Sequence, residues 1–237
     1  YLATGHYAQV RQVGDTFRLL RGVDQTKDQS YVLYTLGQEE LRSLLLPVGQ
    51  YTKPEIRKIA ADLGLAVADK PDSQDICFIP DNDYRSFVAQ RVEARPGEIV
   101  DGAGNVLGTH RGIAYYTIGQ RHGLGVTLPQ RLYVTGIDPV RNRVIVGPED
   151  DLYSREVLAE DVHFVQGNAL CQLPLEVRAK IRYKSLESPA TLYPVPGGVT
   201  VVFQEPQRAV TPGQAIVFYQ GDEVIGGGCI ALPAAPE

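Results

Sequence analysis

The sequence predicts an α/β first part followed by two all-β domains, the last of them a small antiparallel β-barrel. Helical periodicity is confined to roughly the first 90 residues. After Arg95-Pro96-Gly97 short strands separated by glycine replace it, and from about residue 151 apolar and polar residues alternate as in half-buried strands. We therefore expect domains at 1–90, 91–150 and 151–237.

Two helices are predicted in the first part, at 38–46 and 52–63. The first places three leucines on one stripe and ends before Pro47. The second begins with Thr52 and has Glu55 three residues later, which is the spacing of a capping box. This part is completed by a short strand at 17–22 and a third helix from about Asp81.

The middle of the chain predicts hairpins. Residues 98–100 and 106–108 flank Asp-Gly-Ala-Gly-Asn, and 132–137 is expected to pair with 144–146. Between them, the glycine-rich stretch 115–125 fits no phosphate-binding or dinucleotide-binding fingerprint, and we interpret it as a bent β segment.

The last part predicts a strand at 175–184 in which apolar residues alternate with cations. One face would be wholly basic, which is either a nucleic-acid-binding patch or a solvated strand whose lysines protect a sheet edge. Strands at 198–203, 215–219 and 224–230 complete a set suited to a barrel, with the turn 208–214 at its rim. The cations of the basic face are Arg178, Lys180, Arg182 and Lys184.

Composition narrows the classes of function. The net charge of −5 gives no general attraction for nucleic acid, so such binding has to come from a local patch. No apolar run approaches the ~18 residues of a membrane span and no leader opens the chain, so we expect a cytoplasmic protein. Three scattered cysteines predict neither a disulfide framework nor a structural metal. Because the chain contains no Met and opens on strand-like sequence, we interpret it as part of a longer protein.

The stretch Lys70–Pro80 carries the most informative cysteine. Extended alternation would point the Cys77 sulfur away from its apolar neighbours Ile76 and Phe78, which favours a displayed thiol. The alternative is a buried, inert cysteine, since free cysteine behaves as a small hydrophobe. The nearby carboxylates Asp72 and Asp75 would raise the pKa of the thiol. A reactive Cys77 therefore needs positive charge from elsewhere.

Two polar segments of the first part have similarly open interpretations. Gly5, in the strand-end turn Thr4-Gly5-His6, is either a turn residue or a point of close backbone approach. His6 is either a satisfied surface histidine or a functional one. The segment 27–31 combines charged and amide side chains just before apolar residues, and taken singly it is a polar loop or a helix start.

Six motifs, in order and over nearly the whole chain, closely resemble the tRNA-specific 2-thiouridylases. They are Ala-Thr-Gly-His-Tyr-Ala (3–8), Lys-Asp-Gln-Ser-Tyr (27–31), Ser-Gln-Asp-Ile-Cys-Phe-Ile (73–79), Tyr-Thr-Ile-Gly-Gln-Arg-His-Gly-Leu (116–124), Arg-Tyr (182–183) and Arg-Ala-Val-Thr-Pro-Gly-Gln (208–214).

The resemblance implies a partial Rossmann-like PP-loop ATP pyrophosphatase domain, a central β domain and a barrel that together hold a tRNA with a wobble uridine. It implies that ATP, with Mg²⁺, adenylates the uridine 2-oxygen, which sulfur from a cysteine persulfide then replaces. Carried over, Cys77 matches the persulfide-bearing cysteine and Gly5 a nucleotide-binding glycine. The resemblance implies a sulfur-donor protein as the second partner, either a relay protein or a cysteine desulfurase. It implies no association with a membrane. The positions matching tRNA contacts are His6, Lys27, Asp28, Gln29, Arg182, Tyr183 and Gln214.

Two departures from the family pattern limit this expectation. Neither the phosphate-cradling Ser-Gly-Gly-Val-Asp-Ser loop nor the second catalytic cysteine has a match here, and Cys171 and Cys229 are interpreted as structural. We therefore expect an incomplete portion of the enzyme that is inactive alone. Two alternatives remain at this point: a PP-loop enzyme with another substrate, or a non-enzymatic RNA-binding module in which Cys77 is buried.

Overall fold

The computed structural model describes residues 1–66, 86–87, 90–91, 94–125, 131–167 and 174–232. Contacts divide the chain into two compact units, which are described separately. Unit 1 comprises Tyr1–Lys70, Arg155–Glu205 and Thr211–Glu237, and unit 2 comprises Pro71–Ser154 and Pro206–Val210. The division into domains at 1–90, 91–150 and 151–237 stays a prediction. Within the described ranges, no helix combines the length and apolar character needed to cross a membrane.

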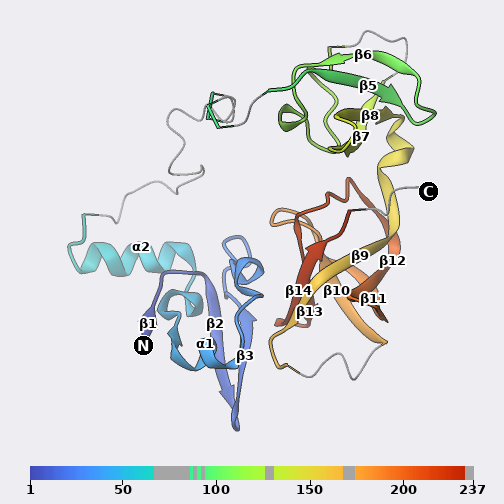
Figure 1. Ribbon diagram of the computed structural model, residues 1–237. Coiled ribbons are helices and arrows are strands. Elements are labelled where there is room, and N and C mark those ends of the chain that lie inside the picture. The colour runs from blue at the N-terminus through green and yellow to red at the C-terminus, as the bar shows by residue number, and fades with distance from the viewer. Residues whose placement is uncertain (67–85, 88–89, 92–93, 126–130, 168–173, 233–237) are drawn as a thin grey trace. The chain divides into compact units, whose positions relative to one another are not determined.

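A closed antiparallel barrel of six strands forms the larger part of unit 1 (Figure 1). The strands follow one another around it in the order β10-β11-β12-β9-β14-β13, and β13 pairs back to β10. Its alternating apolar residues, such as Leu192, Phe203 and Phe218, are fully buried. The predicted barrel is therefore confirmed. Its strands are β9 (Tyr153–Phe164), β10 (Leu175–Lys180), β11 (Ser188–Val195), β12 (Gly198–Arg208), β13 (Ala215–Gln220) and β14 (Glu223–Ile230).

The first segment of unit 1 has α/β character, as predicted. Strands β1 (Leu2–Ala3) and β4 (Leu44–Leu45) pair in parallel. The antiparallel hairpin of β2 (Ala8–Val13) and β3 (Thr16–Arg21) joins the barrel sheet through β14. The helical elements are α1 (Gln38–Ser43), α2 (Lys53–Asp62) and the 3₁₀ turns η1 (Ser30–Leu33) and η2 (Pro47–Gln50).

The two helix predictions fared differently. The capping box of α2 is confirmed, because the Thr52 amide and hydroxyl both donate to the Glu55 carboxylate, at 2.7 and 2.8 Å. The helix predicted at 38–46 was too long, since Leu44 and Leu45 leave it to pair with β1. Tertiary pairing overrides helical spacing there. The helix expected from Asp81 lies almost wholly outside the described residues.

Unit 2 contains a four-stranded sheet in the order β6-β5-β8-β7. Both predicted hairpins are confirmed, and β5 and β8 add a parallel pairing that the sequence did not predict. The stretch 115–125 is a series of turns instead of a strand, held to β7 where the Gly119 amide donates to Val134 and the Val134 amide to Gln120. The elements are β5 (Gly97–Asp101), β6 (Val106–His110), η4 (Ile113–Tyr115), β7 (Tyr133–Asp138), β8 (Arg143–Gly147) and η5 (Glu149–Leu152).

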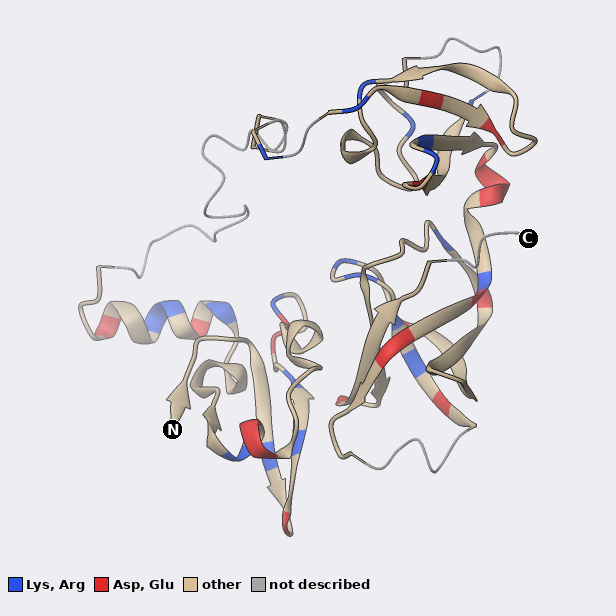
Figure 2. Ribbon diagram, viewed as in Figure 1, with Lys and Arg blue, Asp and Glu red and all other residues tan. Residues whose placement is uncertain are grey.

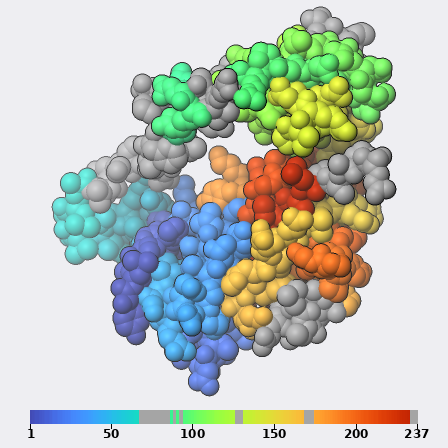
Figure 3. All heavy atoms as spheres, viewed as in Figure 1, coloured from blue at the N-terminus to red at the C-terminus, as the bar shows by residue number. Residues whose placement is uncertain are grey.

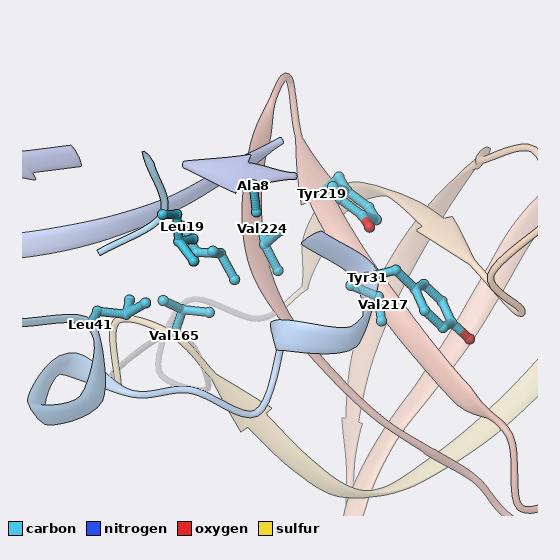
Figure 4. Packing of buried hydrophobic residues seen from close by; sticks show 9 residues of the cluster. Ala8, Leu19, Tyr31, Leu41, Val165, Val217, Tyr219 and Val224 are labelled. Carbon is cyan, nitrogen blue, oxygen red and sulfur yellow. The ribbon is translucent and has the colours of Figure 1, made fainter. Parts of the chain in front are cut away.

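One hydrophobic cluster joins the first segment to the barrel within unit 1. Figure 3 shows the blue spheres of the first segment directly against the yellow and orange spheres of the barrel. Burial of apolar area on both sides fixes the loops of the first segment relative to the barrel strands. The side chains of this cluster, most of them labelled in Figure 4, are Ala8, Leu19, Tyr31, Leu41, Leu46, Val165, Val217, Tyr219 and Val224.

Candidate functional site

The loop 27–31 is held in place by its own acidic residue. The Asp28 carboxylate accepts hydrogen bonds from the Gly22 amide, the Ser30 amide and the Ser30 hydroxyl, at 3.0, 3.1 and 2.9 Å. Ser30 is fully buried, with its hydroxyl oxygen 3.5 Å from that of Tyr219 on β13. Asp28 therefore shapes the loop, and these three bonds direct its carboxylate into the protein.

Gln29 ties the same loop to the segment that carries His6. Its amide donates to the Tyr7 carbonyl at 2.8 Å, and its side-chain oxygen accepts from the Tyr7 amide at 3.0 Å. This two-way contact resembles a strand pair and places the loop 27–31 beside the turn that follows β1. Residues 22 positions apart in the chain are thereby brought together.

The loop meets the barrel through two tyrosines. The Tyr31 hydroxyl donates to the Ala215 carbonyl at 2.6 Å, and its ring makes an edge contact with Tyr183, with centroids 6.1 Å apart. The Lys180 ammonium lies 5.7 Å from the centroid of each ring. Gln214, exposed and adjacent to Ala215, lies beside this contact in the chain. The structure thus brings the 27–31 loop, Tyr183 and the neighbourhood of Gln214 together.

The strand predicted at 175–184 ends earlier than expected. β10 stops at Lys180, and residues 181–185 form a turn closed by the Ser185 amide and hydroxyl, which both donate to the Arg182 carbonyl. The predicted continuous basic face is therefore wrong, because Arg182 and Lys184 lie on the turn (Figure 2). We call residues 180–184 the basic turn.

The cations of this region are not equivalent. Arg178 lies 3.5 Å from the Glu187 carboxylate and donates to the Glu187 carbonyl at 2.9 Å, and Arg21 pairs with the same carboxylate. Lys180, Arg182 and Lys184 have no ion-pair partner among the described residues. The charge of Glu187 is thus balanced by Arg21 and Arg178. The charges of the basic turn remain available to an external anion.

The pKa shifts agree with this placement. Burial raises the pKa of Tyr31 to about 12, with a smaller contribution from Tyr34. Burial also raises the pKa of Tyr183, the Asp28 carboxylate adds to the rise, and the Lys27 ammonium opposes it. The Asp28 carboxylate and the Lys27 ammonium are therefore close enough to the Tyr183 hydroxyl to affect its pKa.

Gly5 and His6 follow the carboxyl end of β1. The Thr4 amide still donates to the Leu45 carbonyl at 3.0 Å, and the Thr4 hydroxyl lies 2.7 Å from Nδ1 of His6. Nothing described lies within 4 Å of where a Cβ on Gly5 would stand. Open space at the carboxyl end of a parallel strand is where ligands bind in open α/β sheets.

A hollow of about 1040 Å³ in unit 1 lies away from the described site residues. It runs between β2 and the segment from α1 to η2, with Tyr1 at its margin. None of the predicted site residues that the structure describes lines it. The volume therefore does not coincide with the site that the motifs predict.

Two of the three cysteines, Cys77 and Cys171, lie outside the described residues. Cys229 is a half-buried free thiol on β14, and its sulfur makes a weak contact to the Ile230 carbonyl oxygen at 3.8 Å. Among the described residues, no group of three or more His, Cys, Asp or Glu could hold a metal ion.

Sequence reasoning did not single out Tyr31 and Lys180 as partners of Tyr183. The alternation in 175–184 placed Lys180 among four equal cations, and Tyr31 was the last letter of a motif. Only the fold shows that the two side chains meet the Tyr183 ring.

Comparison with family models accounts for almost the whole chain. Residues 1–81 match the "tRNA methyl transferase HUP domain", 85–148 the "tRNA methyl transferase PRC-barrel domain", and 154–230 the "Aminomethyltransferase beta-barrel domain". Fold and matches together define a protein class in which an α/β HUP segment precedes a small β domain and a β-barrel.

Curated relatives identify the family within that class. "tRNA-specific 2-thiouridylase MnmA" of Heliobacterium modesticaldum is 52% identical over 236 residues, covering 97% of this chain and 61% of the relative. The proteins of the same name from Acetivibrio thermocellus and Clostridium perfringens are 50% and 48% identical, each covering 97% of this chain and 65% of the relative. The chain belongs to the tRNA-specific 2-thiouridylase family, and it spans 61–65% of the length of these relatives.

Proposed function

We propose that this chain carries the tRNA-binding surface and the sulfur-bearing cysteine of a tRNA uridine 2-sulfurtransferase. The observation that carries the proposal is the meeting of two motifs distant in the chain. The Tyr31 ring from the 27–31 motif contacts the Tyr183 ring from the Arg-Tyr motif, and both belong to one packed unit. This contact supports a single tRNA-binding surface that includes the 27–31 loop and Tyr183, with cations at its margin that have no ion-pair partner among the described residues.

The chemistry assigned to this surface suits its residue types. An unpaired nucleotide can stack on an exposed aromatic ring, and Tyr183 is 42% exposed. Cations on the basic turn would contact phosphates, which position an RNA without reading its sequence. Asp28 and Gln29 act differently, because their side chains are engaged within unit 1 and hold the loop. They are positioning residues in this proposal.

The reactive part of the proposal rests on Cys77. The C2 carbonyl of uracil is a poor electrophile with a poor leaving group, so its oxygen has to be activated before sulfur attacks. ATP, when bound with Mg²⁺, supplies the adenylyl group that makes this oxygen a leaving group. The terminal sulfur of a Cys77 persulfide would form the bond to C2 while the bond from C2 to the activated oxygen breaks and AMP leaves. A second thiol would then attack the Cys77 sulfur, which breaks the bond between the two persulfide sulfurs, leaves one sulfur on C2 and forms a disulfide with Cys77. The family resemblance gives that thiol no counterpart in this chain.

The residues at the end of β1 fit a nucleotide. Gly5 leaves open space, and the turn follows the carboxyl end of a strand in parallel pairing. A backbone without a side chain allows close approach of a phosphate or sugar. His6, held by Thr4 and adjacent to Tyr7, would lie between the nucleotide and the 27–31 loop.

The proposed partners are a tRNA with a wobble uridine and a sulfur-donor protein that loads Cys77. We place the protein in the cytoplasm and propose functional divisions at 1–90, 91–150 and 151–237. The relatives' shared name supports thiolation over a different PP-loop substrate or a non-enzymatic RNA-binding role. We further propose that the chain alone binds tRNA without catalysing the reaction.

Replacement of the sulfur-bearing residue tests the proposed activity. In protein expressed from its complete reading frame, Cys77→Ser should abolish formation of 2-thiouridine, measured by mass spectrometry of digested tRNA, and should leave the Kd for tRNA unchanged. Cys229→Ser is the matched control and should retain thiolation, because its thiol lies on a barrel strand.

Two outcomes would contradict this proposal. Retained thiolation in Cys77→Ser removes the persulfide role. A large loss of tRNA affinity in that variant indicates a structural cysteine instead. Thiol labelling of the native protein adds an independent check, since Cys77 should react faster than Cys171 and Cys229.

A further inference from the structure

The basic turn contains Lys180, a cation that lies outside all six family motifs. Lys180 closes β10, and its ammonium is 5.7 Å from the centroids of both Tyr31 and Tyr183. Tyr31 is buried and fixed by its hydrogen bond to Ala215, whereas Tyr183 is exposed. The ammonium is therefore held at the margin of an exposed ring.

The charges around Lys180 leave it available to an external anion. Among the described residues, no carboxylate lies within ion-pair distance of its ammonium. Asp28 accepts three hydrogen bonds from Gly22 and Ser30, and Glu187 is paired with Arg21 and Arg178. These two acids are thus engaged with other partners.

From this geometry we propose that Lys180 is an RNA-contacting residue that binds the phosphate next to a nucleotide stacked on Tyr183. An ammonium has three donors, so it can face two rings and still donate to a phosphate oxygen. The rings hold the flexible lysine stem in one position, which reduces the entropy lost on binding. This inference rests on the proposed tRNA-binding function and assigns that surface a further residue.

Single-stranded nucleic acid fits the arrangement better than a small acidic ligand. A splayed base needs a flat exposed ring with a cation one phosphate away, and Tyr183 with Lys180 provides this pair. Arg182 and Lys184 extend the positive charge along the same turn, as a continuing backbone requires.

The experiment measures binding of the 237-residue chain to an unmodified tRNA transcript with a wobble uridine, by filter binding over a range of salt concentrations. Lys180→Ala should weaken binding about five- to tenfold and reduce the slope of log K against log salt by about 0.7 to 0.9, the value of one phosphate contact. Lys180→Arg should restore most of the slope, and Lys180→Gln should not. Urea unfolding of each variant separates lost binding from lost folding.

Lys58→Ala is the matched control, because it removes the same charge from an exposed position on α2, outside the basic turn, and it should change Kd by less than about twofold. An equal loss in Lys180→Ala and Lys58→Ala would overturn the specific role of Lys180. Wild-type affinity and slope in Lys180→Ala would overturn the inference and leave the proposed function standing. Absence of salt-dependent binding by the wild-type chain would overturn both.

Discussion

Asp28 in unit 1 and Asp101 in unit 2 each accept three hydrogen bonds, yet they serve different regions of the molecule. Asp101 binds the Ala103 amide and the backbone and side-chain amides of Asn105, all within its own hairpin turn. Asp28 binds Gly22 and Ser30, and the loop that it shapes packs against the barrel. The Asp101 carboxylate closes a local turn, whereas the Asp28 carboxylate holds a loop of the candidate site in place.

The difference shows how the candidate site is built. The turn of unit 2 is specified by neighbouring residues and is exposed, so water can replace its bonds. The loop of unit 1 depends on contacts between segments far apart in the chain, from Tyr7 through Gln29 to Tyr31 and Ala215. Side chains directed inward hold this loop, and those of Tyr183 and the basic turn remain at the surface for binding.

Replacing Asp28 should give the largest effect on stability. Asp28→Ala removes a charged acceptor and leaves the buried Ser30 hydroxyl and the Gly22 amide without it, so we expect the free energy of unfolding to fall by about 3 kcal/mol. Urea denaturation measures this loss. The matched variant Asp101→Ala should have a much smaller effect, and equal losses in the two variants would remove the distinction between the regions.

Alkaline pH should weaken unit 1 through Tyr31. Burial raises the pKa of Tyr31 from 10.0 to about 12, so the unfolded chain releases this proton first as the pH rises. The contribution to stability is complete below pH 10 and is lost between pH 10 and 12, by about 2 kcal/mol.

Tyr31→Phe tests that contribution. The variant should lose about 1 kcal/mol at neutral pH with its hydrogen bond to Ala215, and its unfolding free energy should fall less between pH 10 and 12. Tyr219, whose pKa burial also raises, keeps part of the alkaline dependence. An unaltered pH profile in Tyr31→Phe would show that the Tyr31 hydroxyl is not buried in solution.

Arg182→Ala should affect binding with little change in stability. Among the described residues, the hydrogen bonds of Arg182 in the turn go to its carbonyl and not to its side chain, so the free energy of unfolding should change by less than about 0.5 kcal/mol. The affinity for tRNA should fall about fivefold, and its salt dependence should flatten. An unchanged slope of log K against log salt in filter binding would count against a contact between Arg182 and a phosphate. A large loss of stability would show that the Arg182 side chain is engaged within unit 1.

Much of the fold could be predicted because its signals are local. The capping box of Thr52 and Glu55 and the hairpin turn at Asp101 depend on residues a few positions apart. The end of β10 at Lys180 and the pairing of Leu44 with Leu2 depend on distant partners. For that reason the alternation in 175–184 and the leucine stripe in 38–46 predicted elements that were too long.

For the candidate site, six ordered motifs establish which side chains are present and which family they belong to. The folded chain adds that Asp28 and Gln29 are engaged inside unit 1, and that Lys180 and Tyr31 lie against Tyr183. A motif specifies side-chain chemistry locally, whereas hydrogen-bond partners and burial arise when distant segments pack into one hydrophobic core.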